Sequence, residues 1–151
     1  MTEFHILNRS QFKPEEISEV ARFVCPRGVD YFNISAVSFS TFKEYSASKM
    51  HGRGIVSGIC GGAATDEVGP AGRIYVAVHR SKTFPKDFRG QGASVRFADP
   101  AEVLVFVLAH ELRHLWQRGR WNLTKHSKRA CEVDANRYAT KQLKRWRLYE
   151  R

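Results

Sequence analysis

The sequence predicts a single α+β domain in which a small, mostly antiparallel sheet packs on helices. Three observations indicate this fold class. The 151 residues are the usual length of one domain, and no linker or internal repeat divides residues 1–151. Segments rich in β-forming residues dominate the first half, and segments with helical periodicity dominate the second. A hydrophobic content of 42% with 26% charged residues is typical of a globular protein and excludes a disordered chain.

The first half is expected to hold one helix among several strands. Pro14 suits the first turn of a helix, and Glu15 and Glu16 favour its positive N-terminal end. Apolar residues then recur with helical spacing until Pro26 and Gly28 end the pattern. Short segments rich in β-formers predict strands at residues 4–7, 31–42, part of 51–62 and 73–79.

The second half is expected to hold two long helices after a loop. Residues 81–98 contain a proline and two glycines, which predict a long loop. Asp99 is placed to cap a helix whose first half is apolar on every side and which ends at Gly119. A last helix is predicted from about Ser127 to about Leu148.

The residues most informative for function are His-Glu-Leu-Arg-His, at positions 110–114. On a helix, His110 and His114 lie on one face about one turn apart, so that two imidazole nitrogens can bind one Zn²⁺ ion. Glu111 lies beside them, where it can act as the general base on a metal-bound water. Because this polar group stands at the end of an apolar helix, its side chains need partners. The motif therefore predicts a zinc site, in preference to two surface histidines.

A zinc site of this kind needs a third protein ligand, and two residues are available for it. Glu132 lies on the predicted last helix, and small alanines on the same face favour a close approach to the histidines. Asn136, one turn later, is expected to accept a hydrogen bond from the outer nitrogen of a ligand histidine and so to fix its tautomer. His126, twelve residues after His114, is the alternative third ligand.

The combination of HELRH with the later segment 132–139 resembles the gluzincin metallopeptidases. The segment reads E-x-x-A-N-x-Y-A, which is especially similar to E-x-x-A-N-x-F-A in the ImmA/IrrE family. It is also similar to E-x-x-A-D-x-Y-A in the membrane-bound Ste24/HtpX type. The resemblance covers residues 99–140 and implies a minimal zincin-like domain with one zinc ion. The site residues that it implies are the zinc ligands His110, His114 and Glu132, the catalytic base Glu111 and the supporting residue Asn136.

A weaker resemblance links the chain to SprT-like proteases, which use a third histidine some way past HExxH and cleave DNA-bound proteins. By that resemblance His126 would be the third ligand, and a basic C-terminal region would suit a substrate bound to nucleic acid. The residues around Glu132 match the gluzincin pattern, whereas those around His126 do not match the SprT-like one. Glu132 is therefore preferred.

The resemblance to gluzincins implies a zinc-dependent peptidase that acts on a peptide or protein substrate. The strand at residues 73–79 would be the edge strand that pairs with an extended substrate. The residues considered for oxyanion stabilisation or substrate contact are Tyr138, His126, Tyr75 and His79. Two alternatives stay open. One is a nucleic-acid-associated protein, either a SprT-like protease or a DNA-binding protein with structural zinc, and the other is an inactive zincin-like interaction module.

Charge and cysteine content bear on partners and location. The chain carries 25 Lys and Arg against 15 Asp and Glu, a net charge of +10, and residues 113–151 alone carry +9. This asymmetry predicts a nucleic acid or another acidic partner at the basic C-terminal region. The three cysteines, Cys25, Cys60 and Cys131, are odd in number and far apart, which favours a reducing compartment. Without a signal peptide or a long apolar run, a cytoplasmic protein without membrane contact is expected.

Overall fold

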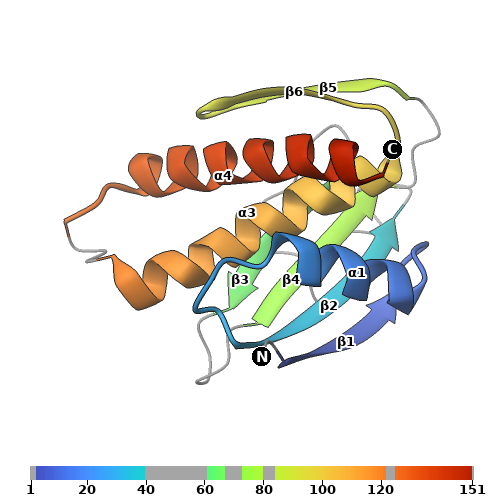
Figure 1. Ribbon diagram of the computed structural model, residues 1–151, viewed down its shortest axis with the longest axis horizontal. Coiled ribbons are helices and arrows are strands. Elements are labelled where there is room, and N and C mark those ends of the chain that lie inside the picture. The colour runs from blue at the N-terminus through green and yellow to red at the C-terminus, as the bar shows by residue number, and fades with distance from the viewer. Residues whose placement is uncertain (1–2, 40–60, 67–72, 80–83, 122–124, 151) are drawn as a thin grey trace.

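The computed structural model describes residues 3–39, 61–66, 73–79, 84–121 and 125–150. Its elements follow in the order β1 (Glu3–Arg9), α1 (Pro14–Val24), β2 (Tyr31–Phe39), β3 (Gly61–Asp66), β4 (Arg73–His79), β5 (Lys86–Gly90), β6 (Ala93–Phe97), α3 (Pro100–Arg120) and α4 (Lys128–Tyr149). Figure 1 shows α1 and α3 covering one face of a sheet, with α4 against α3 and the β5–β6 hairpin against α4. This arrangement confirms the α+β fold class.

Most predicted elements are present at the expected positions. The strands predicted at 4–7, 31–42 and 73–79 correspond to β1, β2 and β4, and α1 and α4 begin within one residue of their predicted starts. Residues 40–60 lie outside the described residues, which leaves the predictions for 40–42 and for most of 51–62 untested. β3 begins at Gly61, near the end of the latter segment.

The main sheet has the strand order β1-β2-β4-β3, and its strand directions differ from the prediction. β1 pairs with β2 and β2 pairs with β4 in parallel, while β3 runs antiparallel to β4. The prediction of a mostly antiparallel sheet is wrong here, because α1 connects β1 to β2 as a crossover helix and returns the chain to the same end of the sheet. The prediction that residues 73–79 form an edge strand is also wrong, since β4 lies between β2 and β3.

The core lies between the sheet and the two helices that cover it. Phe32 and Ile34 alternate along β2 with half-buried polar residues and are almost completely buried. Ile34 stands beside Ile74 of β4 in the strand register. Ile17 of α1 and Leu108 of α3 are fully buried in the same cluster. Burying each such side chain contributes about 1.5–3 kcal/mol. The shared burial of these residues therefore holds α3 on the sheet.

α3 begins as predicted but ends later. The Asp99 side chain accepts a hydrogen bond from the backbone amide of Glu102 at 3.0 Å and caps the helix. The helix passes through Gly119 and ends at Arg120, one residue after the predicted end. The helix continues because the Trp121 amide still bonds at 2.7 Å to the carbonyl one turn earlier, which offsets the low helix propensity of glycine. No helix among the described residues, α3 included, is long and apolar enough to cross a membrane.

The segment 81–98, predicted as a loop, instead contains an antiparallel hairpin. β5 and β6 pair along their whole length. Gly92 in the two-residue turn has a φ of 81°, which glycine adopts without strain. Phe88 and Phe97 pack on Phe106 of α3, with ring centroids 5.3 and 5.5 Å away. The glycines that predicted a loop therefore belong to a hairpin with an apolar face on α3.

An ion pair joins the start of α3 to the end of α4. Arg147 donates from Nε and Nη2 to the two carboxylate oxygens of Glu102, at 2.9 and 2.8 Å. Glu102 also accepts a hydrogen bond from the Ala98 amide at 2.8 Å. Burial raises the pKa of Glu102, but the bonds from Arg147 and Ala98 outweigh burial and bring this pKa below its ordinary value. The carboxylate is therefore held in its ionised form.

Replacing Glu102 by glutamine is expected to lower the free energy of unfolding by about 1–3 kcal/mol at neutral pH, because Arg147 loses a charged two-point acceptor. Since the folded pKa of Glu102 is depressed, its stabilisation is present above the unfolded carboxyl pKa and is lost as pH falls through the folded value. Urea unfolding of Glu102→Gln between about pH 7 and about pH 2 measures this loss. The control is Glu3→Gln, at an exposed position of β1. A destabilisation that stays constant over this pH range would contradict the assignment.

Candidate metal centre

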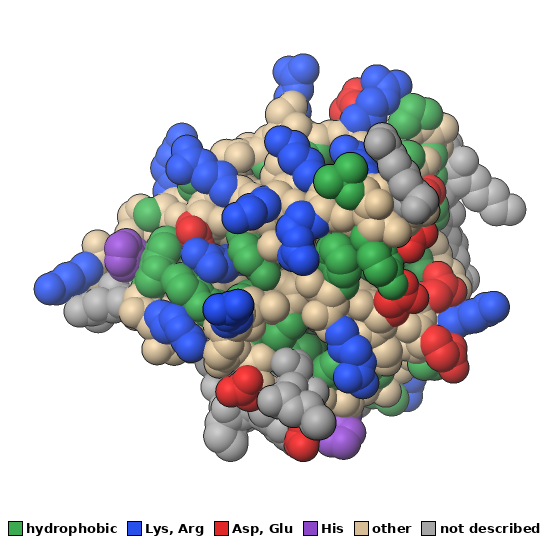
Figure 2. Space-filling model, in the orientation of Figure 1, with side chains coloured by type: hydrophobic (Ala, Val, Ile, Leu, Met, Phe, Trp, Pro, Cys, Tyr) green, Lys and Arg blue, Asp and Glu red, His purple; other side chains and the backbone are tan. Residues whose placement is uncertain are grey.

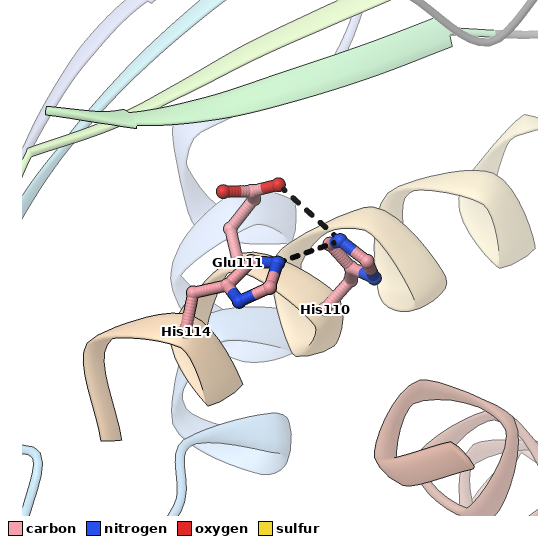
Figure 3. A group of neighbouring side chains, drawn as sticks. All are labelled: His110, Glu111 and His114. Atoms are coloured by element: carbon pink, nitrogen blue, oxygen red, sulfur yellow. Dashed lines mark hydrogen bonds and ion pairs between the residues drawn. The ribbon is translucent and has the colours of Figure 1, made fainter. Parts of the chain in front are cut away.

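α3 places His110, Glu111 and His114 together. The helical repeat sets the two histidines on one face, and their Nε2 atoms lie 3.0 Å apart. His110 and Glu111 have exposed fractions of 8% and 1%, and His114 is half-buried. Figure 3 shows the imidazoles side by side, with the Glu111 carboxylate on the side that faces the sheet. The three side chains can hold a metal ion, since one ligand atom from each lies within 4.8 Å of the others.

α4 adds Glu132 to this group. Its Oε2 lies 3.2 Å from Nε2 of His110, and its Oε1 lies 3.1 Å from Nε2 of His114. Ala135 and Ala139, three and seven residues later on the same side of α4, are fully buried. Their small side chains allow α4 to approach α3 closely enough for Glu132 to contact both histidines.

The spacing of the three ligand residues fits a small cation. Their nearest nitrogen and oxygen atoms lie 3.0–3.2 Å apart. Ligand atoms held about 2.0–2.1 Å from a tetrahedral zinc ion would lie roughly 3.3 Å from one another. Two imidazole lone pairs and a carboxylate repel one another at such distances unless a proton or a metal ion lies among them. The arrangement therefore calls for a shared proton or a bound cation among these atoms.

Gln117 determines which nitrogen of His114 faces the other ligands. Its amide nitrogen donates to the Cys131 carbonyl and to the Asp134 carboxylate, both at 2.9 Å. Its amide oxygen therefore faces Nδ1 of His114, at 2.9 Å, and Nδ1 must donate the hydrogen. When the imidazole of His114 is neutral, its Nε2 is therefore left with a lone pair for a metal. His110 lacks such support, because its Nδ1 is buried and has no hydrogen-bond partner within the described ranges.

The supporting role predicted for Asn136 belongs to Gln117 in the structure. Asn136 is buried, but its Nδ2 donates to the Gln91 carbonyl at 2.6 Å and ties the hairpin turn to α4. Arg113 strengthens the support of Gln117, because it donates to the Asp134 carboxylate at 2.7 and 3.3 Å. The spacing in the sequence could have identified Gln117. It follows His114 by three residues, and two residues at this spacing lie on the same face of a helix.

The charges around the cluster reinforce its preference for a cation. Hydrogen bonds from His110 and His114 hold the pKa of Glu132 far below its ordinary value. Burial lowers the pKa of His114, but the hydrogen bond to Glu132 and the charge of Glu111 outweigh burial and raise it. Glu132 is thus negatively charged, and the two carboxylates stabilise a positive charge, carried by a proton or a metal ion, at the imidazoles.

Glu111 differs in position from the three ligand residues. Its Oε1 lies 3.7 Å from Nε2 of His110, beyond hydrogen-bond distance, and the side chain is 1% exposed. Glu132 approaches the same nitrogen more closely, at 3.2 Å. Glu111 therefore lies beside the cluster, where it can exchange a proton with a small molecule bound there.

Tyr138 and His126 have structural contacts away from the cluster. The Tyr138 hydroxyl donates to the Val24 carbonyl at 2.5 Å, and burial raises the pKa of Tyr138 to about 12. The Tyr138 hydroxyl is thus engaged by Val24, and the oxyanion or substrate contact expected of it stays a prediction. His126 is exposed and stacks on Trp121, with ring centroids 4.3 Å apart. The structure thus brings Glu132, and not His126, to the two histidines.

Tyr75 and His79 both lie on β4. Their side chains are outside the described part of the structure. The substrate or oxyanion contacts expected of them stay predictions.

Comparisons with known proteins give no relative for this chain. No protein-family model, no curated protein and no solved structure matches it. The functional interpretation therefore depends on the geometry described above.

Proposed function

We propose that the protein is a zinc-dependent peptidase of the gluzincin type, which hydrolyses a peptide or protein substrate. The observation that carries this proposal is the mutual contact of His110, His114 and Glu132, whose ligand atoms lie 3.0–3.2 Å apart. Two imidazoles and one carboxylate form the ligand set of many catalytic zinc sites, which keep a fourth position open. Glu111, buried beside the ligands, supplies the acid–base group that such a reaction needs.

The donor atoms favour zinc over other divalent ions. Imidazole nitrogens are common zinc ligands, whereas Mg²⁺ and Ca²⁺ prefer sites made of oxygen atoms. Burial and the charges of Glu132 and Asp134 raise the pKa of Cys131, next to Glu132 in the chain. The free thiol of Cys131 is therefore protonated at neutral pH, and the proposed ligand set is the two histidines and the glutamate whose ligand atoms contact one another.

Each residue of the site has a separate task in this proposal. Zinc, when bound, would supply a Lewis acid and lower the pKa of water to near 7. Glu111 accepts the proton of the attacking water and then delivers it to the leaving amine. Gln117 keeps His114 in the tautomer that presents Nε2, and Asp134 with Arg113 keeps Gln117 in place.

The substrate is proposed to pair with β3. Within the described residues, β3 is hydrogen-bonded on one side, to β4, and it also contacts α3. The Glu111 carboxylate faces the sheet from α3 (Figure 3). An extended peptide added along β3 would bind through its main chain, with weak sequence preference.

Zinc loading and peptide cleavage together test the proposal. Protein equilibrated with zinc is expected to bind one ion per chain and to cleave an unfolded protein such as reduced casein. Cleavage should stop when a chelator removes the ion and return when zinc is added back. Failure to bind zinc at neutral pH would refute the metal site. Stoichiometric zinc without cleavage of any member of a peptide mixture would refute the peptidase and support an inactive interaction module.

A further inference from the structure

The outward face of α4 is strongly basic. Exposed Lys and Arg side chains follow the helix along its length: Lys128, Arg129, Arg137, Lys141, Lys144 and Arg145. The two acidic residues of this helix, Glu132 and Asp134, are half-buried and bonded to α3. Figure 2 shows Lys and Arg side chains over α4, in a region of the surface with few acidic ones. Most of the charge excess of residues 113–151 is therefore displayed on one helix.

Three of these residues form a stripe that is not neutralised within the protein. Arg137, Lys141 and Lys144 follow one another at intervals of four and three residues and so lie on one side of the helix. Within the described ranges, none of the three has an ion pair or a side-chain hydrogen bond, whereas Arg113 and Arg147 each bind a carboxylate. An unneutralised row of like charges raises the local potential and favours a polyanion as partner.

A hollow of about 410 Å³ lies at the N-terminal end of this stripe. Its lining includes Trp121, Arg129, Val133 and Arg137. It therefore combines an aromatic ring and an aliphatic side chain with two guanidinium groups. Asp134 also lines the hollow, but its carboxylate is engaged by α3 at 2.7 Å. The volume lies within the range of small-molecule sites and can accommodate a single base.

The aromatic ring of the hollow is held in place by its neighbours. His126 stacks on Trp121 with ring centroids 4.3 Å apart, and Trp116 meets it edge-on at 6.2 Å. A ring fixed in this way loses little freedom when a planar ligand packs against it. His126 covers one face of the indole, so a base would stack on its other face or in place of His126, next to the arginines of the hollow.

We propose that the stripe and the hollow together bind single-stranded nucleic acid. The phosphates would lie along Arg137, Lys141 and Lys144, and an unpaired base would enter the hollow beside Trp121. The stripe lies on a different side of α4 from Glu132, which contacts α3. Asp134 lines the hollow and also supports Gln117, so nucleic-acid binding is tested at the stripe and at Trp121, with Asp134 left unchanged.

Two other anionic partners fit the surface less well. A membrane-surface helix inserts an apolar face between lipids, but Ala139, Leu143 and Trp146 of α4 are buried against the protein, and its exposed apolar residues, Leu148 and Tyr149, lie only at its C-terminal end. An acidic protein segment would use the charges but carries a planar group only where it holds an aromatic residue, whereas every nucleotide carries a planar base beside its phosphate. Single-stranded nucleic acid uses both features.

The test is fluorescence anisotropy with a labelled oligothymidylate of about 15 nucleotides, starting at about 20 mM salt. Binding should weaken with salt, with a slope of log K against log salt of about −0.7 for each phosphate contact. Lys141→Gln/Lys144→Gln should weaken binding about tenfold and reduce the slope by about 1.4, because two contacts are lost. Trp121→Leu should weaken binding about tenfold and leave the slope unchanged, since stacking is not an ionic contact.

The control is Arg9→Gln/Lys13→Gln, which removes the same charge from β1 and the start of α1 and should leave binding unchanged. Absence of binding at about 20 mM salt would overturn the proposal. An equal loss in the control would also overturn it, because only net charge would then matter. Equal affinity for polyglutamate or for vesicles of anionic phospholipid, with no effect of Trp121→Leu, would assign the surface to an acidic protein or a membrane instead.

Discussion

Glu111→Gln is expected to lower the rate of peptide hydrolysis by about 10²–10⁴-fold while one zinc ion stays bound to each chain. Glutamine has nearly the same shape as glutamate but cannot accept and return a proton. The ligand atoms of His110, His114 and Glu132 contact one another and do not depend on Glu111. The chemical step should therefore be lost and the metal retained.

Peptide cleavage under substrate-saturating conditions, with zinc content measured on the same samples, checks this prediction. Glu15→Gln is the matched control, because it makes the same chemical change at an exposed position of α1. Undiminished hydrolysis in Glu111→Gln would show that another group activates the water. Simultaneous loss of zinc would show that Glu111 is a ligand.

Glu132→Gln is expected to weaken zinc binding by more than about 100-fold, because removing a ligand should cost more than the 10–100-fold effect of removing a supporting residue. The neutral amide replaces a carboxylate that contacts both histidines at 3.1–3.2 Å. Isothermal titration with zinc against a competing chelator measures the change.

The same substitution should remove the thermal stabilisation by zinc. At zinc concentrations about 100 times the dissociation constant, binding stabilises the folded wild-type protein by about 2.7 kcal/mol, and the variant should lose nearly all of this. His126→Ala is the control and should bind zinc as the wild type does, because His126 stacks on Trp121. If His126→Ala lost zinc and Glu132→Gln kept it, the SprT-like arrangement would be supported instead.

The local features of this chain were largely predictable from its sequence. The helix that carries His110 and Glu111 is specified by its cap at Asp99 and by an apolar first half, and the structure has it there. Helix periodicity also placed Glu132 on one face with the small residue Ala135, as neighbours within one or two turns allow. Its contact with the histidines joins two helices, and the resemblance to gluzincins favoured it over His126.

The features that were missed depend on contacts between distant segments. Strand direction depends on how α1 crosses the sheet. The sequence pattern of a strand does not reveal whether its neighbour runs parallel or antiparallel to it. The partner of Asn136 was misjudged because Gln91 belongs to a hairpin taken for a loop. Tyr138 bonds to Val24, 114 residues away, and no local pattern encodes that contact.

The environment of α4 differs around its circumference. Glu132 contacts the histidines of α3, Asn136 binds the hairpin turn at Gln91, and Arg137 faces outward. An α-helix turns by about 100° for each residue, so an insertion or deletion of one residue within α4 would displace all the contacts that follow it. A change of length in the connection before Ser127 would leave them in place. Among chains that share this site, we therefore expect length variation before Ser127 and none between Glu132 and Arg137.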